Sequence, residues 1–403
     1  MDDDELIRWR LASHRLAGPG FPSTADGASD VVRWLGAVQS QDHEPALWSL
    51  AQRAGGVSLA ELARAFDAAA FVRTHVLRPT WHFVPPEELR ALLALTGPRV
   101  AAGCAARWRD LDLPASLRTR ATEVMAAAID ERGPLTRPEL KVVLESAGIS
   151  TAGQRLPHLL MHAELVAVLV SGGMRGRQHT WALVDDRVPA GRPFDREEAL
   201  RSLAVRYVRS HGPVTQRDFA WWSGLTLRDV REGLELATPD VGVLETGGRR
   251  YWYGEEPPRG AADGPHVHLV QSFDEYLVAY SESRDLADQA GYAKQMPRGW
   301  MLTTALLVDG SLAGRWRRSL TAGRAAVEVL TFASLSTVQR NALEAEAQRF
   351  AAFVGLPLRL VVREGGTDEA GGAPSEEERQ RDAGGQVRSR TGATSGRTRT
   401  SAG

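Results

Sequence analysis

The sequence predicts an α+β protein that is mainly α-helical, with short β-hairpins and a smaller C-terminal α+β region. Two segments share one order of features: an apolar-periodic helix, a Gly-Pro pair with a following threonine, a further helix and a glycine-bearing pair of strands. These segments centre on Thr136 and Thr215. Near the N-terminus, helical spacing is again followed by two alternating strands. A helix, a helix-turn-helix and a hairpin in this order are typical of a winged helix, so three of them are expected in tandem.

The first winged helix is assigned to residues 1–110. Ser58 and Glu61 have the spacing of a capping box that opens a helix. Asp30 is expected to cap an earlier helix, which runs through Trp34 and Leu35. A pair of strands with a turn near Arg78-Pro79 follows. Helices are expected over residues 5–17, over 30–35, from 58 onward and again after 86, and the strands over 71–84.

The second and third winged helices are assigned to residues 111–190 and 191–258. Thr136 and Glu139 form a predicted capping box, and Thr215 with Asp218 forms a weaker one. Each segment is then expected to have a strand, a Gly-Gly turn and a returning strand. These lie at 165–169, Gly172-Gly173 and 180–184 in the second segment, and at 241–244, Gly247-Gly248 and 250–253 in the third.

Residues 259–363 are expected to form a small α+β cap. Their predicted elements are strands over 268–270, 306–310, 326–330 and 358–361 and a long helix over 336–354, with Arg315, Trp316, Arg317 and Arg318 between two of the strands. Residues 364–403 contain no aromatic side chain and are dominated by Gly, Ser, Thr, Glu and Arg. That composition predicts a disordered tail.

Composition narrows the class of protein. The chain has 403 residues, a formal net charge of −1 and a single cysteine, Cys104, which is expected to be a buried apolar residue. A near-neutral chain binds nucleic acid only through local basic patches, and one cysteine excludes an intrachain disulfide. No apolar run is long enough to span a membrane. The acidic start Met1-Asp2-Asp3-Asp4-Glu5 is unlike a signal peptide, so a cytoplasmic location is expected.

A short polar stretch interrupts an apolar region. Gln39, Ser40, Gln41 and Asp42 follow Val38, and apolar spacing resumes after Pro45. Amides enclosed between apolar anchors must be hydrogen-bonded, and two that are two residues apart point the same way on an extended backbone. Such a pair can hold a water between a donor and an acceptor. The alternative is a helix C-terminus with satisfied caps.

Three ordered segments carry a family resemblance. The stretch Val38–Asp42 resembles the Gln-x-Gln motif of the AlkZ/YcaQ family of winged-helix DNA glycosylases. The stretch Thr74–Val84 is similar to that family's Arg-x-Thr-Trp-His segment, and Ser272–Tyr280 resembles its Phe-Asp-Glu-Tyr segment. The resemblance implies a monofunctional glycosylase acting on N-alkylated purines in double-stranded DNA, with bulky adducts and interstrand crosslinks included. A monomer without cofactor or metal is expected.

The implied chemistry suits two glutamines. An N7-alkylguanine is already cationic and leaves without protonation, so what remains is an oxocarbenium-like sugar and an attacking water. We assign the catalytic roles to Gln41, which would orient the water, and Gln39, which would support the sugar or Gln41. No lysine lies in this stretch, which disfavours Schiff-base lyase chemistry.

DNA contacts are expected from the hairpins. Basic and polar side chains cluster beside glycines that let the backbone approach a phosphate. The candidates are Arg175, Arg177, Gln178 and His179 in the second wing, Arg249 in the third, and Arg78, Trp81 and His82 in the first hairpin. The alternative for the second wing is an exposed turn that is polar because turns are polar.

Other polar residues give weaker signals. Asp274 and Tyr276 are candidates for lining the cleft, and Asp274 with Glu275 could form an acid/base pair. Neighbours on a strand point to opposite faces, so only one carboxylate would face a cleft; the alternative is a structural carboxylate that accepts hydrogen bonds. The spacing of His43, His75 and His82 fits no standard zinc site.

Two other functions remain open at the level of sequence. One is a non-catalytic winged-helix DNA-binding protein or regulator, and the other is a structural or protein-interaction role. Salt-dependent DNA binding separates the last from the other two. Release of a free alkylated base separates the enzyme from the regulator.

Overall fold

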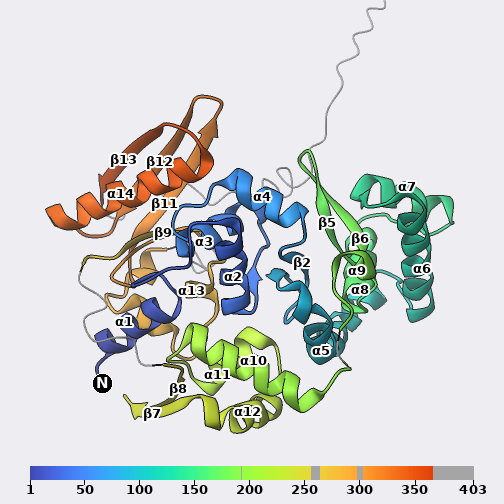
Figure 1. Ribbon diagram of the computed structural model, residues 1–403, viewed down its shortest axis with the longest axis horizontal. Helices are drawn as coiled ribbons and strands as arrows, with labels where there is room; N and C mark the ends of the chain where they lie inside the picture. The colour runs from blue at the N-terminus through green and yellow to red at the C-terminus, as the bar shows by residue number, and fades with distance from the viewer. Residues whose placement is uncertain (192, 256–263, 297–302, 366–403) are drawn as a thin grey trace, which may run out of the picture. The chain divides into compact units, whose positions relative to one another are not determined.

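The computed structural model describes residues 1–191, 193–255, 264–296 and 303–365 (Figure 1). Helices and strands are mixed along these residues, so the predicted α+β class is confirmed. The predicted tail falls almost entirely on residues 366–403, which lie outside the described residues. None of the described helices is long and apolar enough to cross a membrane.

The first segment, residues 1–110, contains a three-stranded sheet. Its elements are α1 (Asp3–Ser13), α2 (Ala25–Leu35), β1 (Val38–Gln39), α3 (His43–Arg53), α4 (Leu59–Asp67), β2 (Val72–His75), β3 (Trp81–Val84), η1 (Pro86–Glu88) and α5 (Leu89–Asp110). Strand β3 lies between β1 and β2. The capping box of Ser58 and Glu61 is confirmed. Asp30 does not cap α2, because Thr24 takes that place and accepts from the Gly27 N–H.

The second segment, residues 111–190, repeats this order. Its elements are α6 (Ala115–Arg132), β4 (Leu135–Thr136), α7 (Arg137–Ser146), α8 (Arg155–Leu165), β5 (Leu169–Arg175), β6 (Gln178–Leu183) and α9 (Val184–Arg187). Strand β6 lies between β4 and β5. The predicted strand over 165–169 is wrong, because α8 continues to Leu165. Gly172 and Gly173 lie inside β5 at an irregularity in its pairing with β6, and the turn is made at Gly176.

A close approach explains why glycine occupies this part of β5. A Cβ atom on Gly172 would lie 2.2 Å from the Thr180 hydroxyl oxygen of the partner strand. The backbone N–H of Met174 donates to Asp67 at 2.7 Å, which ties the strand to α4. The glycines therefore allow strand packing here rather than forming the tip of the wing.

The third segment, residues 191–258, has the same order again. Its elements are α10 (Arg196–His211), α11 (Gln216–Ser223), α12 (Leu227–Leu236), η2 (Thr238–Asp240), β7 (Gly242–Thr246) and β8 (Arg249–Tyr253). Val214 pairs with Trp252 of β8, which in turn pairs with β7. The Thr215–Asp218 capping box and the positive-φ turn at Gly247-Gly248 are as predicted.

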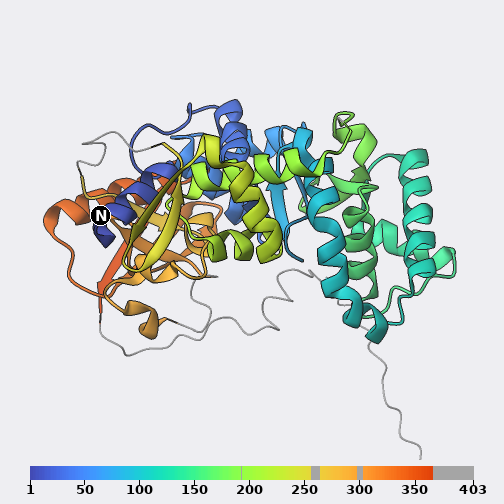
Figure 2. The ribbon, with the colours of Figure 1, turned by 90° about the horizontal axis from the view of Figure 1, so that it is seen from below.

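The C-terminal region, residues 264–365, is built on a five-stranded sheet (Figures 1 and 2). Its elements are β9 (Val267–Val270), α13 (Glu275–Val278), η3 (Arg284–Asp288), η4 (Tyr292–Gln295), β10 (Ala305–Val308), β11 (Ser311–Thr321), β12 (Arg324–Thr331), α14 (Thr337–Val354) and β13 (Leu358–Glu364). The strand order is β13-β12-β11-β10-β9, and only the β12–β13 pair is parallel. Arg315–Arg318 lie within β11 rather than between strands.

The first segment and the C-terminal region share one core. Trp48 of α3 packs against Phe350 of α14 with ring centroids 5.3 Å apart, and its indole donates to the Leu269 carbonyl of β9 at 2.8 Å.

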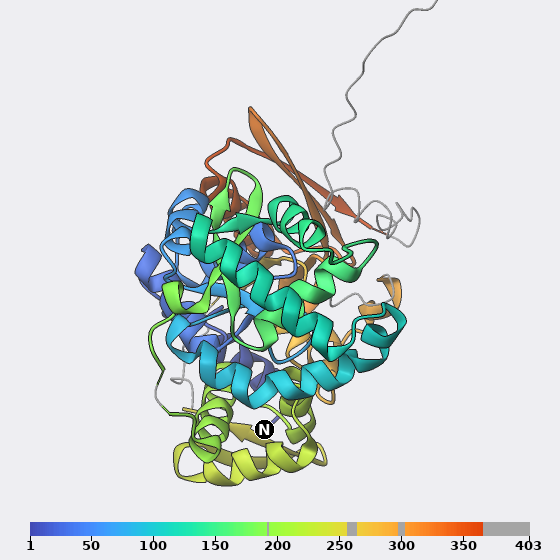
Figure 3. The ribbon, with the colours of Figure 1, turned by 90° about the vertical axis from the view of Figure 1, so that its right-hand side faces the viewer.

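In Figure 3 the helices of the second segment lie nearest the viewer. Cys104 is buried, as predicted. The start of α13 lies against the end of β1, where the polar stretch begins, because the Gln39 N–H donates to Glu275.

Candidate functional site

The polar stretch lies where β1 ends and the chain turns into α3. Val38 and Gln39 pair with Phe83 and His82 of β3. Successive strand residues point to opposite faces, and Val38 is fully buried in the apolar core. Gln39 is only 5% exposed, so its side chain is enclosed too, but among polar groups.

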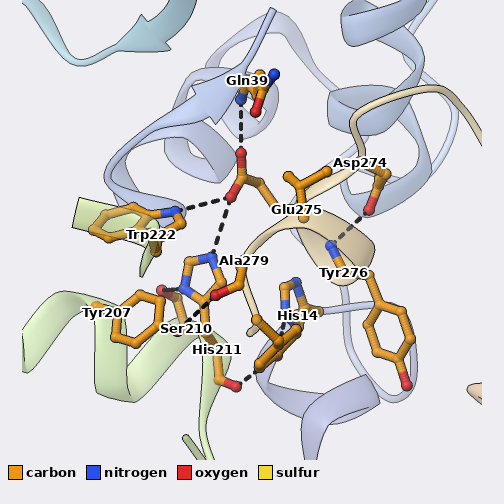
Figure 4. Close-up of polar contacts among 12 residues, drawn as sticks. His14, Gln39, Tyr207, Ser210, His211, Trp222, Asp274, Glu275, Tyr276 and Ala279 are labelled. Carbon is orange, nitrogen blue, oxygen red and sulfur yellow. Dashed lines mark hydrogen bonds and ion pairs between the residues drawn. The ribbon is translucent and has the colours of Figure 1, made fainter. Parts of the chain in front are cut away.

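Gln39 is held at two points by residues distant in the sequence. Its backbone N–H donates to Glu275 Oε1 at 2.7 Å, and its side-chain Oε1 accepts from Arg78 Nη2 at 3.0 Å. Glu275 is the first residue of α13 and is 1% exposed. Its other oxygen accepts from Trp222 Nε1 at 2.9 Å and lies 3.6 Å from His211 Nε2 (Figure 4). The first segment, the third segment and the C-terminal region therefore meet at Gln39.

The guanidinium of Arg78 makes hydrogen bonds to protein groups, so it is not available to bind a phosphate. Its Nη1 donates to the backbone carbonyl of Trp222, and its Nη2 contacts Gln39 and lies 3.4 Å from His82 Nε2. Burial lowers the pKa of Arg78, with the charge of Glu275 opposing that shift, yet a guanidinium stays protonated in proteins. This placement corrects the expected DNA contact: the cation faces inward because the turn after β2 packs on the loop after α11.

The contact with Arg78 fixes which way the Gln39 amide points. A guanidinium has donors and no acceptor, so the amide atom facing it must be oxygen. The Gln39 Nε2 group is then directed away from Arg78, and it donates to no residue that the structure describes. Gln39 therefore presents a hydrogen-bond donor.

Gln41 has the opposite environment, because its side chain is exposed. Its Oε1 faces the Trp81 N–H at 3.5 Å, the outer limit of a hydrogen bond. Arg73 fixes the loop itself by donating to the carbonyls of Ser40 at 3.0 Å and Gln41 at 3.2 Å. The backbone is anchored while the Gln41 amide remains accessible.

Arg73, which bonds this loop, also packs on the ring of Trp81. The Arg73 guanidinium lies 4.2 Å from the centre of the Trp81 ring, and that ring lies 4.4 Å from His75. Burial lowers the pKa of Arg73 to about 10, so it remains charged at neutral pH. Trp81 is half-buried between these partners, so only part of its ring could face DNA.

Two buried histidines of the site, His82 and His211, have lowered pKa values. His82 is fully buried, with Nδ1 3.0 Å from the Thr80 carbonyl, and burial together with Arg78 holds the pKa of its imidazole well below the usual value. Burial likewise lowers the pKa of His211, whose Nδ1 lies 2.8 Å from Ser210 Oγ (Figure 4). A buried neutral ring cannot reach a phosphate, so the expected DNA contact of His82 is corrected. Among the described residues no three His, Cys, Asp or Glu side chains gather as they would around a metal ion.

Asp274 and Tyr276 lie in the interior and do not line a cleft. Asp274 is completely buried, caps α13 by accepting from the Tyr276 N–H at 2.9 Å, and pairs with Arg53 at 2.9 Å. The Tyr276 hydroxyl donates to the Gly310 carbonyl. Asp274 and Glu275 begin a helix rather than occupying a strand, so the alternation rule did not apply to them. Asp274 is the structural carboxylate of the alternative interpretation, and Glu275 is the one that reaches Gln39.

The hairpin of β5 and β6 carries only part of the basic tip that was expected for the second wing. Arg177 and Gln178 are exposed at the turn. Arg175 is exposed as well, but it is paired with Glu139 at 2.7 Å. His179 lies farther down the strand, with its ring 4.8 Å from that of His43 in α3. It is half-buried and packs against the first segment, so its DNA contact stays a prediction.

In the hairpin of β7 and β8, a carboxylate compensates the charge of Arg249, the residue expected to contact DNA in the third wing. Arg249 donates to both oxygens of Asp285 at 2.9 Å. Hydrogen bonds from this guanidinium to Asp285 raise the pKa of Arg249. A phosphate would have to compete with Asp285 for this cation, whereas the neighbouring Arg250 is exposed.

Acid is expected to weaken the contact between the first and second segments. Burial and the nearby charge of Arg73 lower the pKa of His179 to about 3, against about 6.5 in an unfolded chain. Because the folded-state value is depressed, the stability from neutral His179 is complete above pH 6.5 and is lost as the pH falls toward 3. The midpoint of thermal unfolding, measured from pH 7.5 to 4.5, should fall less in His179→Asn than in the wild type. Equal slopes would contradict this assignment.

Several residues of the site carried no sequence signal. Trp222, His211 and Arg73 lie far from the polar stretch in the chain, and nothing in their spacing points to it. Glu275 was visible as part of a Phe-Asp-Glu-Tyr segment, but its partner was not. The contacts that join them appear only in the folded chain.

Comparisons with known proteins bear on this geometry. A profile of the family described as DNA glycosylase AlkZ-like matches residues 32–353. The chain is similar to an interstrand DNA cross-link repair glycosylase of Streptomyces sahachiroi, with 25% identity over 390 residues, covering 89% of this chain and 98% of that protein. Its fold is similar to the solved structure of the Streptomyces sahachiroi DNA glycosylase AlkZ, with a TM-score of 0.72 and 21% identity over 90% of this chain and 100% of that one. The chain therefore belongs to the AlkZ-like family of DNA glycosylases.

Proposed function

We propose that this glycosylase hydrolyses the N-glycosidic bond of N-alkylated purines in double-stranded DNA, including bulky adducts and interstrand crosslinks. The similar Streptomyces sahachiroi protein is named an interstrand DNA cross-link repair glycosylase, which supports this substrate class. The proposal treats the enzyme as monofunctional. Lys141 and Lys294 are its only lysines, and the polar stretch itself contains none, so this stretch supplies no amine for imine chemistry.

The observation that carries the proposal is a difference between two glutamines at the end of β1. In the part of the chain that the structure describes, Gln39 has a free hydrogen-bond donor, and Gln41 has a nearly free acceptor. The Oε1 of Gln39 is occupied by Arg78, which leaves its NH₂ group as a donor. Gln41 is exposed, and among the described residues its Oε1 has one long contact, with the Trp81 N–H. A water can accept from Gln39 and donate to Gln41, which would leave its remaining lone pair for attack on the sugar. The N-glycosidic bond breaks as the neutral alkylated base leaves, and the surplus proton of the added water passes to solvent.

The substrate class follows from what neutral amides can supply. Two glutamines offer positioning and dipoles but no proton with a useful pKa. A purine alkylated at N7 or N3 is already cationic and needs no proton to leave. The sugar then carries the developing charge, which the Gln41 carbonyl dipole stabilises while it orients the water. Intact neutral bases would not be removed.

We infer that residues 1–110, 111–190 and 191–258 are three winged helices that approach DNA. Each has a helix, a short strand or bridge, two helices and a hairpin, and in each the last strand pairs with both others. In the expected winged-helix arrangement the second helix of the helix-turn-helix and the hairpin face the duplex. The C-terminal α+β region would then cap the first of them through its shared core.

Arg177 is expected to contribute more to DNA binding than Arg175. Both are exposed on the second wing, but Arg175 is already neutralised by Glu139. Arg177→Ala should therefore weaken binding of an undamaged duplex and reduce the slope of log K against log salt by about one. A binding titration at several salt concentrations measures this, with Arg175→Ala as the matched control. A larger change for Arg175→Ala would contradict the assignment.

A panel of alkylated duplexes tests the proposed substrate class. It should include N7-methylguanine, N3-methyladenine, a bulky N7-guanine adduct, a crosslink between two guanine N7 atoms and unmodified DNA. Release of free base, followed by strand cleavage in alkali, is expected for the cationic adducts and not for unmodified DNA. Binding without base release from any adduct would favour the non-catalytic DNA-binding alternative.

A further inference from the structure

We propose that Arg78 and Glu275 are positioning residues that together set the direction of the Gln39 amide. The inference rests on the proposed role of Gln39 in the glycosylase reaction. Neither residue is assigned a contact with DNA or with the reacting water. Each acts on the reaction through the orientation of Gln39.

The two charged groups hold different parts of one residue. Glu275 Oε1 accepts from the Gln39 backbone N–H at 2.7 Å, and Arg78 Nη2 donates to the Gln39 side-chain oxygen at 3.0 Å. Gln39 is the last residue of β1, a strand of two residues that cannot fix its own end. A backbone anchor and a side-chain anchor together restrict both the start and the tip of this side chain.

Arg78 selects one of the two amide orientations. If the amide turned over, its NH₂ group would face a guanidinium that can only donate, and one buried donor would meet another. The orientation with oxygen toward Arg78 is thus strongly preferred, and it leaves the NH₂ group for a water. An arginine in this place decides that Gln39 donates and Gln41 accepts.

Glu275 is itself held in one direction. Trp222 Nε1 donates to Oε2 at 2.9 Å, and His211 Nε2 lies 3.6 Å from the same oxygen (Figure 4). That leaves Oε1 directed at Gln39. The carboxylate also provides a counter-charge for Arg78, because the charge of Glu275 opposes the burial-driven lowering of the pKa of Arg78. The third segment, through Trp222 and His211, thereby controls a residue of the first.

A double-mutant cycle on single-turnover release of N7-methylguanine tests the inference. Arg78→Met and Glu275→Gln, each made alone, should lower the rate by about 10- to 100-fold, the scale of a misplaced catalytic group. In a Gln39→Ala background the same substitutions should change the rate by less than about 3-fold, because there is no amide left to orient. Arg78→Lys, which keeps a donor toward Gln39, should recover part of the lost rate.

Gln39→Glu adds a test of the amide direction. A carboxylate would still accept from Arg78 but lacks the NH₂ donor, so its rate should match that of Gln39→Ala. Two controls test nonspecific damage. Arg99→Met removes a guanidinium that donates to the Gly224 carbonyl near the same loop, and Glu346→Gln alters a buried carboxylate bound to Gln52. Both should keep the wild-type rate.

The possible failures can be told apart. Equal losses for Arg78→Met in the wild-type and Gln39→Ala backgrounds would show a general structural effect and overturn the inference alone. Full activity of Gln39→Glu would overturn the assigned amide direction. A wild-type enzyme that releases no alkylated base would instead fail the proposed function. If Glu275→Gln does not fold, Trp222→Phe takes its place in the cycle. It removes the indole N–H that donates to Glu275 and keeps an aromatic ring against Tyr207 and His211, although it also removes some buried volume.

Discussion

Replacing Gln41 by alanine is expected to lower single-turnover release of an N7-alkylguanine by about 10²–10³-fold. The side chain is exposed at the end of an anchored loop, and its carbonyl is the acceptor that would orient the attacking water. Removing one such preorganised dipole affects the transition state more than the bound ground state. Binding of the damaged duplex should change little, because the phosphate contacts are proposed to come from exposed arginines of the hairpins and not from Gln41.

An abasic-site assay beside a binding titration measures both quantities. Gln41→Glu keeps an acceptor oxygen and should retain more activity than Gln41→Ala. The double variant with Gln39→Ala should lose less than the product of the two single losses, because both amides would serve one water. Full activity of Gln41→Ala would contradict the role assigned to it.

Replacing Asp274 by alanine is expected to lower the free energy of unfolding by about 3–5 kcal/mol. Asp274 and Arg53 are both completely buried, and Ser49 also donates to the carboxylate at 2.6 Å. Removing the carboxylate would leave the Arg53 charge buried without its partner, and it would also remove the cap of α13. Glu275 is the first residue of that helix, so the catalytic site should be disturbed as well.

Urea denaturation of wild-type and variant chains measures this loss. Asp285→Ala is the matched control, because Asp285 pairs with Arg249 through a carboxylate that is 61% exposed, and such a pair contributes at most about 1 kcal/mol. Burial opposes ionisation of Asp274, but Arg53 and hydrogen bonds lower its pKa overall. The stability from the pair should therefore be complete above the unfolded-state pKa of about 4 and be lost as the pH falls from there through the lowered folded-state pKa. A change in unfolding free energy below about 1 kcal/mol for Asp274→Ala would contradict the assignment.

Local chemistry made much of the fold predictable. The capping boxes at Ser58, Thr136 and Thr215 are formed by residues three apart, so they can be read directly from the sequence. In the C-terminal region, alternating apolar residues predict the strands, and the helical repeat of apolar residues predicts the long helix. The tip of the β5–β6 hairpin could not be predicted, because an irregular pairing with β6 and a bond from Met174 to Asp67 keep Gly172 and Gly173 inside β5.

The sequence predicted only those site residues that stand out from their immediate neighbours in the chain. Gln39 and Gln41 stand out because amides interrupt an apolar segment. The sequence could not show that Arg78 faces inward, because its partners Trp222 and Gln39 come from different segments. The interior positions of Asp274 and Tyr276 likewise depend on how α13 packs against Arg53 and Gly310. Packing between segments, rather than spacing within one, decides these roles.

The most direct test of the central claim is base release by the wild-type chain from a duplex carrying one N7-methylguanine. The account predicts free 7-methylguanine and an equal amount of abasic site, formed well above spontaneous depurination, with the strand intact until alkali is added. Base release no faster than the uncatalysed reaction would contradict hydrolysis by this site. Strand cleavage without alkali would contradict a monofunctional mechanism.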